Sequence, residues 1–274
     1  MITPAGVPVA VVAPAAAGSH WVMTPCGNRA LLLGGRPIRH VDVVLDPGHG
    51  GPVDTGAVAP TGLPEKEVNL RVAEAAARML EARGVSTLLT RTGDYPTLLR
   101  VRANLADTLN ATVLVSIHHN APMQAPSPRP GVEIFHENGS DDSRRLGGLI
   151  YERVMAAFAD FTVDWVAQPD AGVMAVLNSS GRDAYGMIRL PETISVLVEL
   201  GYMSNPSEAE LFATPIYARV AGRAITEGVI DYLESDDQGT GFVQARVFNP
   251  LPGVGRDRCV ETPLGMEWPA FGVR

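Results

Sequence analysis

Between residues 41 and 234, short apolar segments alternate with longer amphipathic ones, and this alternation restricts the fold more than any other feature. Apolar runs of about 4–8 residues bounded by Gly, Pro or Asn predict buried strands, and apolar residues spaced three and four apart predict helices. The predicted strands are 41–46, 85–90, 112–118, 131–136 and 194–200, and the predicted helices are 65–83, 97–109, 142–158, 207–212 and 216–233. Strands and helices that alternate in this way form a mostly parallel sheet flanked by helices. We therefore expect a three-layer α/β domain over residues 41–234.

The composition supports a folded domain and excludes several classes of protein. Apolar residues make up 46% and charged residues 19% of the 274 residues, which is enough apolar material for a core. The formal charge is −8, so we expect neither nucleic acid nor an anionic membrane surface as a partner. No apolar run reaches the roughly 20 residues that a membrane-spanning helix needs. We expect a monomer without a membrane span.

The residues on either side of this domain follow a different pattern. Residues 1–40 hold short apolar patches separated by a turn-prone stretch, which predicts a small β appendage. Residues 235–274 contain several Pro and Gly, and we expect a tail or a second half of that appendage. Residues 1–18 are small and apolar like the end of a secretory signal, although no Lys or Arg precedes them and three prolines interrupt them. We expect an exported protein, with a flexible lead segment as the alternative for residues 1–18.

The chain has two cysteines, Cys26 and Cys259, one near each end. Two cysteines are too few for a disulfide-dense scaffold or a Cys-rich zinc module. They either form one bridge that ties the two flanks together or remain unpaired thiols, and the sequence leaves both alternatives open.

Three polar residues follow or end predicted strands of the sheet. His49 comes just after the first strand, His118 ends the third, and Glu199 lies near the end of the last. Ligands of open α/β sheets bind in the crevice outside the carboxyl ends of the strands. These residues are distant in sequence, but we expect them to lie along one edge of the sheet.

A fourth polar residue comes from the first predicted helix. Its apolar stripe consists of Val68, Val72, Ala75 and Met79, and Glu65 lies on the same face. A carboxylate that points inward at this position needs a cation or a role at the helix terminus. Two His and one Glu, with a fourth position open to water, form a known donor set for catalytic zinc. A hydrogen-bonded core histidine is the ordinary alternative for each His.

Five blocks of sequence occur in an order that resembles a known family. They are LDPGHGG at 45–51, Glu65 with Lys66, Arg102, SIHHNA at 116–121 and VLVELGYMSN at 196–205. In these blocks residues 41–234 resemble the zinc-dependent N-acetylmuramoyl-L-alanine amidases of the Amidase_3 type, which cleave bacterial peptidoglycan. The resemblance implies cleavage of the amide between N-acetylmuramic acid and the L-alanine of the stem peptide.

The resemblance also implies roles for four residues. His49, Glu65 and His118 correspond to the zinc ligands, and Glu199 corresponds to the catalytic acid and base. The apolar neighbours of Glu199 favour a raised pKa, whereas a nearby zinc ion lowers it, so the net direction stays open. Two alternatives are a zinc carboxypeptidase-like amidohydrolase and a non-catalytic cell-wall-binding relative. The second should lack a ligand or the acid, but all four positions are occupied here.

Neighbouring residues carry more specific expectations. His118 and His119 are adjacent in a strand and point to opposite faces, so His119 is expected to pack or to line the cleft rather than share the metal. The family often has a small residue at this position. Asp46 either holds the ring of His49 or simply ends its strand. Arg102 is expected to make a structural ion pair.

The irregular segment 160–190 is the expected substrate wall. Its candidate residues are Trp165, Asn178, Arg182 and Tyr185. The sequence between 136 and 194 predicts one long helix and no second one, so we expect an open cleft without a long blocking helix.

Overall fold

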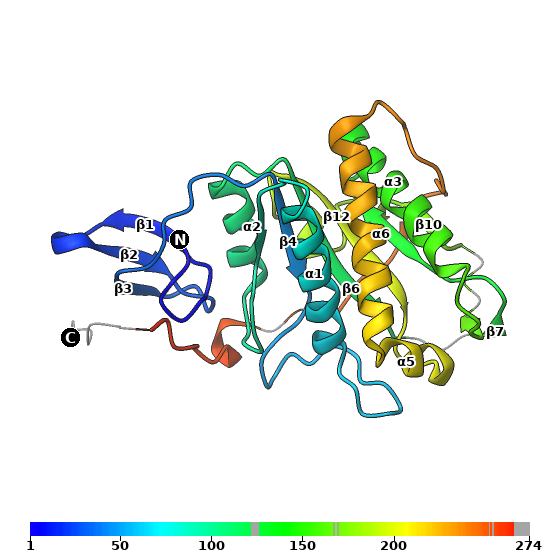
Figure 1. Ribbon diagram of the computed structural model, residues 1–274, viewed down its shortest axis with the longest axis horizontal. Helices are drawn as coiled ribbons and strands as arrows, with labels where there is room; N and C mark the ends of the chain where they lie inside the picture. Colours follow the sequence, from blue (N-terminus) through cyan, green and yellow to red (C-terminus); the bar gives the residue numbers. More distant parts are fainter. Residues whose placement is uncertain (122–125, 167, 169, 252, 254, 266–274) are drawn as a thin grey trace.

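The computed structural model describes residues 1–121, 126–166, 168, 170–251, 253 and 255–265 (Figure 1). A six-stranded sheet of order β10-β8-β12-β6-β4-β5 forms the centre. Its strands are β4 (Val43–Pro47), β5 (Thr87–Leu89), β6 (Val113–Asn120), β8 (Glu133–His136), β10 (Gly172–Met174) and β12 (Ile194–Tyr202). All neighbouring strands pair in parallel except β8 and β12, which are antiparallel. The predicted mostly parallel α/β sheet is confirmed.

Helices cover both faces of this sheet (Figure 1). One layer contains α1 (Glu65–Glu81), α3 (Asp141–Phe158) and α6 (Pro215–Glu234), and the other contains α2 (Leu99–Thr108) and α4 (Gly186–Arg189). Alternate residues of β4 divide between the layers, because Val43 and Leu45 pack in the core with α1 and α6, whereas Val44 packs in the core with α2. Successive side chains of a strand point to opposite faces of the sheet, so β4 is buried under one helix layer on each face.

Local sequence signals fix several helix ends. The hydroxyl of Thr214 accepts a hydrogen bond from the Tyr217 backbone N–H, and Pro215 begins α6. The side chain of Asn205 caps α5 (Pro206–Phe212) in the same way. After α1, Gly84 adopts a φ of +81°, which ends the helical turn and redirects the chain toward β5. The sequence predicted helices at these places.

The irregular segment after α3 contains more structure than expected. It holds β9 (Trp165–Val166), β10, β11 (Val176–Leu177) and α4, and β9 pairs with β7 (Pro126–Ser127). The helix α4 is a single turn long.

No described helix combines the length and apolar character that crossing a bilayer requires.

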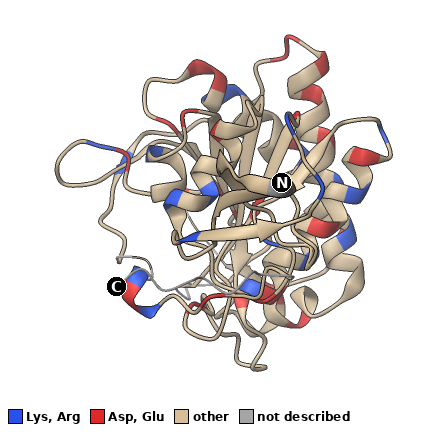
Figure 2. Cartoon of the chain, turned by 90° about the vertical axis from the view of Figure 1, so that its left-hand side faces the viewer, with Lys and Arg blue, Asp and Glu red and all other residues tan. Residues whose placement is uncertain are grey.

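The N-terminal flank forms an antiparallel sheet of β1 (Ala10–Pro14), β2 (Ser19–Met23) and β3 (Arg29–Leu33), with the short helix η1 (Ala16–Gly18) between the first two strands. Val9, Val22 and Leu32 are fully buried in a small core of their own. The stretch compared above with a secretory signal therefore contributes packed residues to this flank. Acidic and basic residues are interspersed in the view onto this side (Figure 2).

The C-terminal segment runs from α6 past the sheet to the N-terminal flank. Its short strand β13 (Arg246–Val247) pairs with β11, and the short helix η2 (Arg256–Arg258) precedes Cys259. Cys259 forms a disulfide with Cys26, which decides between the two alternatives left open above. Glu261 adds to this junction, because its carboxylate accepts hydrogen bonds from Thr24 (2.8 Å) and Asn28 (2.6 Å). The described residues from 246 to 259 are called the C-terminal strap below.

Candidate active site

His49, Glu65 and His118 meet at the carboxyl ends of the central strands. One ligand atom from each lies within 4.8 Å of the others. His49 Nε2 is 3.2 Å from Glu65 Oε2, and His118 Nδ1 is 3.1 Å from Glu65 Oε1. The structure therefore brings together the three residues that the sequence analysis selected, from a loop, a helix and a strand.

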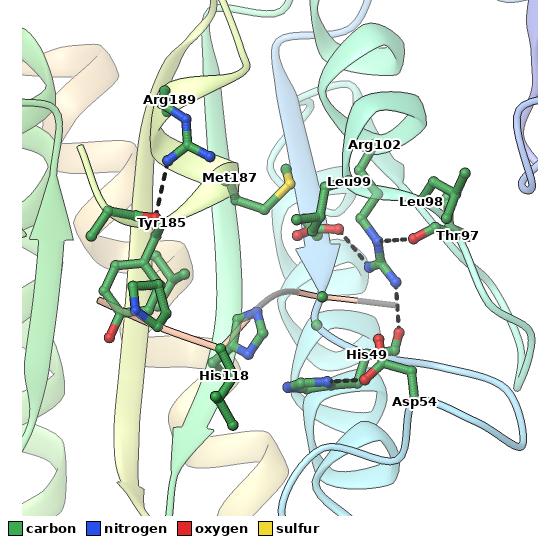
Figure 3. Close-up of a pocket in the computed structure, with 18 of the residues that line it drawn as sticks. His49, Asp54, Thr97, Leu98, Leu99, Arg102, His118, Tyr185, Met187 and Arg189 are labelled. Atoms are coloured by element: carbon green, nitrogen blue, oxygen red, sulfur yellow. Dashed lines mark hydrogen bonds and ion pairs between the residues drawn. The ribbon is translucent and has the colours of Figure 1, made fainter. Parts of the chain in front are cut away.

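Two glycines allow this close approach. A Cβ atom at Gly48 would overlap the ring of His118, and one at Gly56 would overlap the carboxylate of Glu65. His49 itself has a φ of +62°, which is uncommon for a residue other than glycine. Arg102 supports this conformation, because its Nη2 donates a hydrogen bond to the His49 carbonyl at 2.7 Å (Figure 3).

Glu65 is held from several directions. It is 3% exposed. Its Oε2 accepts from the Ala57 backbone at 2.9 Å, and its Oε1 accepts from Asn69 Nδ2 at 3.0 Å. Burial alone would raise the pKa of Glu65, but hydrogen bonds and charge from His118 and His49 hold that pKa well below its usual value. The carboxylate is thus ionised and fixed before any ligand binds.

The second nitrogen of His49 pairs with Asp54, whose Oδ1 lies 2.5 Å from His49 Nδ1 (Figure 3). This contact turns Nε2 toward Glu65. Burial opposes charge on the ring, but the hydrogen bonds to Asp54 and Glu65 raise the pKa of His49 to about 10. The site therefore favours positive charge between its carboxylates, and the same donor set fits a divalent cation.

Asp46 does not hold His49, so that alternative from the sequence was wrong. Its carboxylate is fully buried and accepts from Arg102 Nη1 at 2.8 Å, from Thr90 at 2.5 Å and from Ser116 at 2.6 Å. Burial would raise the pKa of Asp46, but the Arg102 charge and these hydrogen bonds lower it. The structural ion pair expected of Arg102 is confirmed.

His119 lies on the face opposite to His118 and is 2% exposed. Its Nδ1 is 2.7 Å from Asn69 Oδ1, and its Nε2 is 2.7 Å from the Tyr217 hydroxyl. Because Asn69 uses its NH₂ group as the donor to Glu65, its oxygen must accept from His119 Nδ1–H, and Nε2 then accepts from Tyr217. Burial lowers the pKa of His119 to about 3, so the ring is neutral. His119 is a packing residue that orients Asn69 behind Glu65.

Glu199 stands opposite His118 in the register of β12 and β6. Its Oε2 atom is enclosed and has no hydrogen-bond partner among the described residues. Burial raises the pKa of Glu199 well above the ordinary value, and the negative charges of Glu65 and Glu133 add to this. The sequence left open whether the pKa of Glu199 is raised or lowered, and in this structure it is raised.

A cleft of about 380 Å³ contains His49, His118 and Glu199 (Figure 3). Its first wall is the start of α2 with the residues before it, and its second wall is the region around α4. The lining residues of these walls are Pro96, Thr97, Leu98, Leu99, Ala184, Tyr185, Gly186, Met187 and Arg189. The C-terminal strap contributes Pro250, Leu251 and Gly253 to the same cleft.

The expected substrate wall was only partly correct. Tyr185 lines the cleft. Trp165 is 1% exposed and stacks on Phe158 with ring centroids 5.5 Å apart, so it belongs to the core. Asn178 and Arg182 form a turn in which the Asn178 side chain accepts from the Arg182 backbone. Within the described parts of the chain no long helix enters the cleft. The contribution of the C-terminal strap to the cleft was not predicted from the sequence.

The profile of a family described as N-acetylmuramoyl-L-alanine amidase, Amidase_3, matches residues 43–231. This chain belongs to the N-acetylmuramoyl-L-alanine amidase family. The match includes all four predicted site residues, whereas the N-terminal flank and the C-terminal strap lie outside it.

Individual amidases agree with this assignment. The amidase AmiC of Neisseria meningitidis is 31% identical over 229 residues, which cover 73% of this chain and 55% of AmiC. LytC of Bacillus subtilis is 31% identical over 198 residues, covering 72% of this chain and 36% of LytC. This chain thus spans only about half, or less, of these two amidases.

Solved amidase structures share the fold. The amidase AmiC2 of Nostoc punctiforme is 30% identical with a TM-score of 0.58, covering 70% of this chain and 96% of that one. An amidase from Clostridium difficile 630 is 27% identical with a TM-score of 0.60, covering 73% and 100%.

Proposed function

We propose that this protein is a zinc-dependent amidase that hydrolyses the bond between N-acetylmuramic acid and L-alanine in peptidoglycan. The observation that carries this proposal is the meeting of His49, Glu65 and His118 within 4.8 Å, next to the enclosed carboxyl of Glu199. Membership of the amidase family supplies the substrate class.

In this proposal His49, Glu65 and His118 hold the zinc ion. Two imidazoles and one carboxylate are a donor set of catalytic zinc sites, which keep a further position open. A zinc ion bound there would polarise the scissile carbonyl and make a neighbouring water more acidic. The hydrogen bonds of Asp54 and Asn69 keep the donor atoms of His49 and Glu65 directed toward the site.

Glu199 is the proton carrier of the proposed reaction. Its carboxylate accepts a proton from the attacking water as the C–O bond forms, and then gives that proton to the amide nitrogen as the C–N bond breaks. Its raised pKa suits this role, because burial makes the carboxylate a stronger proton acceptor than an exposed one, and the protonated carboxyl can then donate to the leaving nitrogen.

The decisive experiment uses a soluble N-acetylmuramoyl peptide and mass analysis of the products. We expect release of the intact stem peptide and of free N-acetylmuramic acid. A zinc carboxypeptidase would instead shorten the peptide by its last residue, and a non-catalytic wall-binding protein would bind it unchanged. Either of these two outcomes overturns the proposed reaction.

We also propose that the protein works outside the cytoplasm. The Cys26–Cys259 disulfide is of a kind that persists in oxidising compartments. Related proteins from Staphylococcus aureus bear the name probable cell wall amidase LytH. Thiol labelling of the protein in intact and lysed cells tests this, because a cytoplasmic protein would be labelled at both cysteines without prior reduction.

A further inference from the structure

The C-terminal strap begins on the sheet side of the cleft. The Arg246 backbone donates to Ala175 O at 3.0 Å, and the Phe248 backbone donates to Leu177 O at 2.8 Å. The Arg246 side chain forms an ion pair with buried Glu133 at 2.8 Å. This end of the strap is therefore anchored to the second wall of the cleft.

The strap continues along the second wall and then reaches the first. The ring of Phe248 stacks on Tyr185 with a centroid distance of 6.3 Å. Further along, Gly253 packs near Leu99 of α2, where an added Cβ would lie 3.6 Å from the Leu99 Cδ1 atom.

The far end of the strap is held covalently. Arg256 donates to the Gly27 carbonyl at 3.2 Å, and Cys259 is bonded to Cys26. The strap is thus attached on both sides of the cleft, and it lies outside residues 43–231 that match the family.

We propose that the C-terminal strap is a wall of the substrate-binding cleft and that Leu251 contacts the apolar part of the muropeptide next to the scissile amide. This rests on the proposed function. That amide is flanked by the methyl groups of the lactyl unit and of alanine. Leu98, Leu99 and Met187 line the cleft together with Leu251 and present apolar surface to such groups.

Leu251 has the properties of a ligand contact rather than of a core residue. Its side chain is 93% exposed, yet it lines the same cleft as His118 and Glu199. An apolar side chain in a cleft loses its contact with water when a ligand covers it, which favours binding. Because the strap joins both walls, it also prevents a long glycan strand from lying across this side of the cleft.

The first test compares Leu251→Ser with Val247→Ser. Val247 is also in the strap and is 69% exposed, but it does not line the cleft, so neither change removes buried surface. We measure the Kd of a soluble N-acetylmuramoyl peptide by calorimetry in a Glu199→Gln background, which avoids turnover. Leu251→Ser should raise this Kd by about tenfold, and Val247→Ser should leave it unchanged. An unchanged Kd for Leu251→Ser overturns the proposed contact.

The second test releases one end of the strap. In the Cys26→Ser/Cys259→Ser variant, thermal unfolding first confirms a folded protein. We expect the rate on soluble muropeptide to fall relative to the rate on intact sacculi, because the wall is lost and the polymer gains access. An equal ratio in variant and wild type contradicts the role of the strap. If the wild type hydrolyses neither substrate, the proposed function fails, while the binding comparison at Leu251 still decides the contact.

Discussion

Glu199 and His118 occupy opposing positions in β12 and β6, the two central strands of the sheet. The proposed acid and a proposed metal ligand are therefore aligned by backbone register and not by flexible loops. A shift of one residue in this pairing would turn one of the two side chains to the other face. The central strands thus fix the distance over which a proton must move.

Glu199→Gln should abolish turnover without removing metal. The amide is nearly the same size as the carboxyl but neither accepts nor releases a proton near neutral pH, so we expect kcat to fall by about 10²–10⁴-fold. Bound zinc is measured by elemental analysis alongside product release. Glu192→Gln, an exposed change shortly before β12, serves as the control and should keep full activity. A fully active Glu199→Gln would remove this residue from the mechanism.

Metal removal should affect both activity and stability. A chelator should stop hydrolysis and lower the Tm, since a cation that binds only the folded state stabilises it. Added zinc should restore both. In Glu65→Gln the Tm should respond much less to chelator, because one of the three donors is weakened. A wild-type Tm and activity that are indifferent to chelator would contradict a metal site at these residues.

Tyr217→Phe should weaken metal binding from a distance. The change removes the hydroxyl that donates to His119 Nε2, so this buried nitrogen loses its donor and the ring is held less firmly against Asn69. We expect zinc affinity, measured by competition with a chromogenic chelator, to fall severalfold, and stability to drop by about 1–3 kcal/mol. Tyr232→Phe is the matched control, since Tyr232 lies near the surface. Equal zinc affinity in both variants would show that the His119 network only fills space.

Asp46 should make the protein sensitive to acid. Its pKa is lower in the folded state than the usual value of about 3.9, so its contribution to stability is complete above that value and is lost as pH falls toward the folded pKa. Asp46→Asn should flatten the acid limb of the stability curve. It should also cost about 3–5 kcal/mol near neutral pH, because Arg102 is left buried without its charge partner. Urea unfolding at a series of pH values measures both effects.

The disulfide should contribute strongly to stability. The bond joins residues 233 positions apart, and chain-entropy arguments give about 5 kcal/mol as an upper value for so long a loop. Urea unfolding of Cys26→Ser/Cys259→Ser, compared with the oxidised wild type, measures the difference. Reduction of the wild type should reproduce most of the loss, whereas reduction of the double variant should change nothing.

The features predicted best from the sequence are those that depend on the spacing of apolar residues within one strand or helix. His49 and His118 were found because they follow or end apolar strands, and Glu65 because it shares the inward face of a helix with Val68. Asn69 lies one turn after Glu65 on the same face, so its contact was within reach of the same argument. The antiparallel direction of β8 could not be predicted in this way, because the spacing of apolar residues in a strand does not show which way the strand runs in the sheet.

Features that depend on tertiary contacts escaped prediction. Asp54 lies in a loop rich in Gly and Pro, where spacing does not reveal which side chain meets His49. Trp165 was assigned to the cleft because it lies in an irregular segment rich in Gly, Asp and Asn, but stacking on Phe158 places it in the core. Leu251 reaches the cleft only because residues far apart in sequence hold the strap on both sides.

The bond between Cys26 and Cys259 also changes what a single proteolytic cut can do. Every peptide bond of the matched amidase region lies inside the ring that this bond closes. A protease that cleaves one exposed loop within the ring yields two pieces that stay covalently joined through their outer ends. Such a nicked molecule would run as one band until it is reduced, and its proposed catalytic groups would remain tethered to each other.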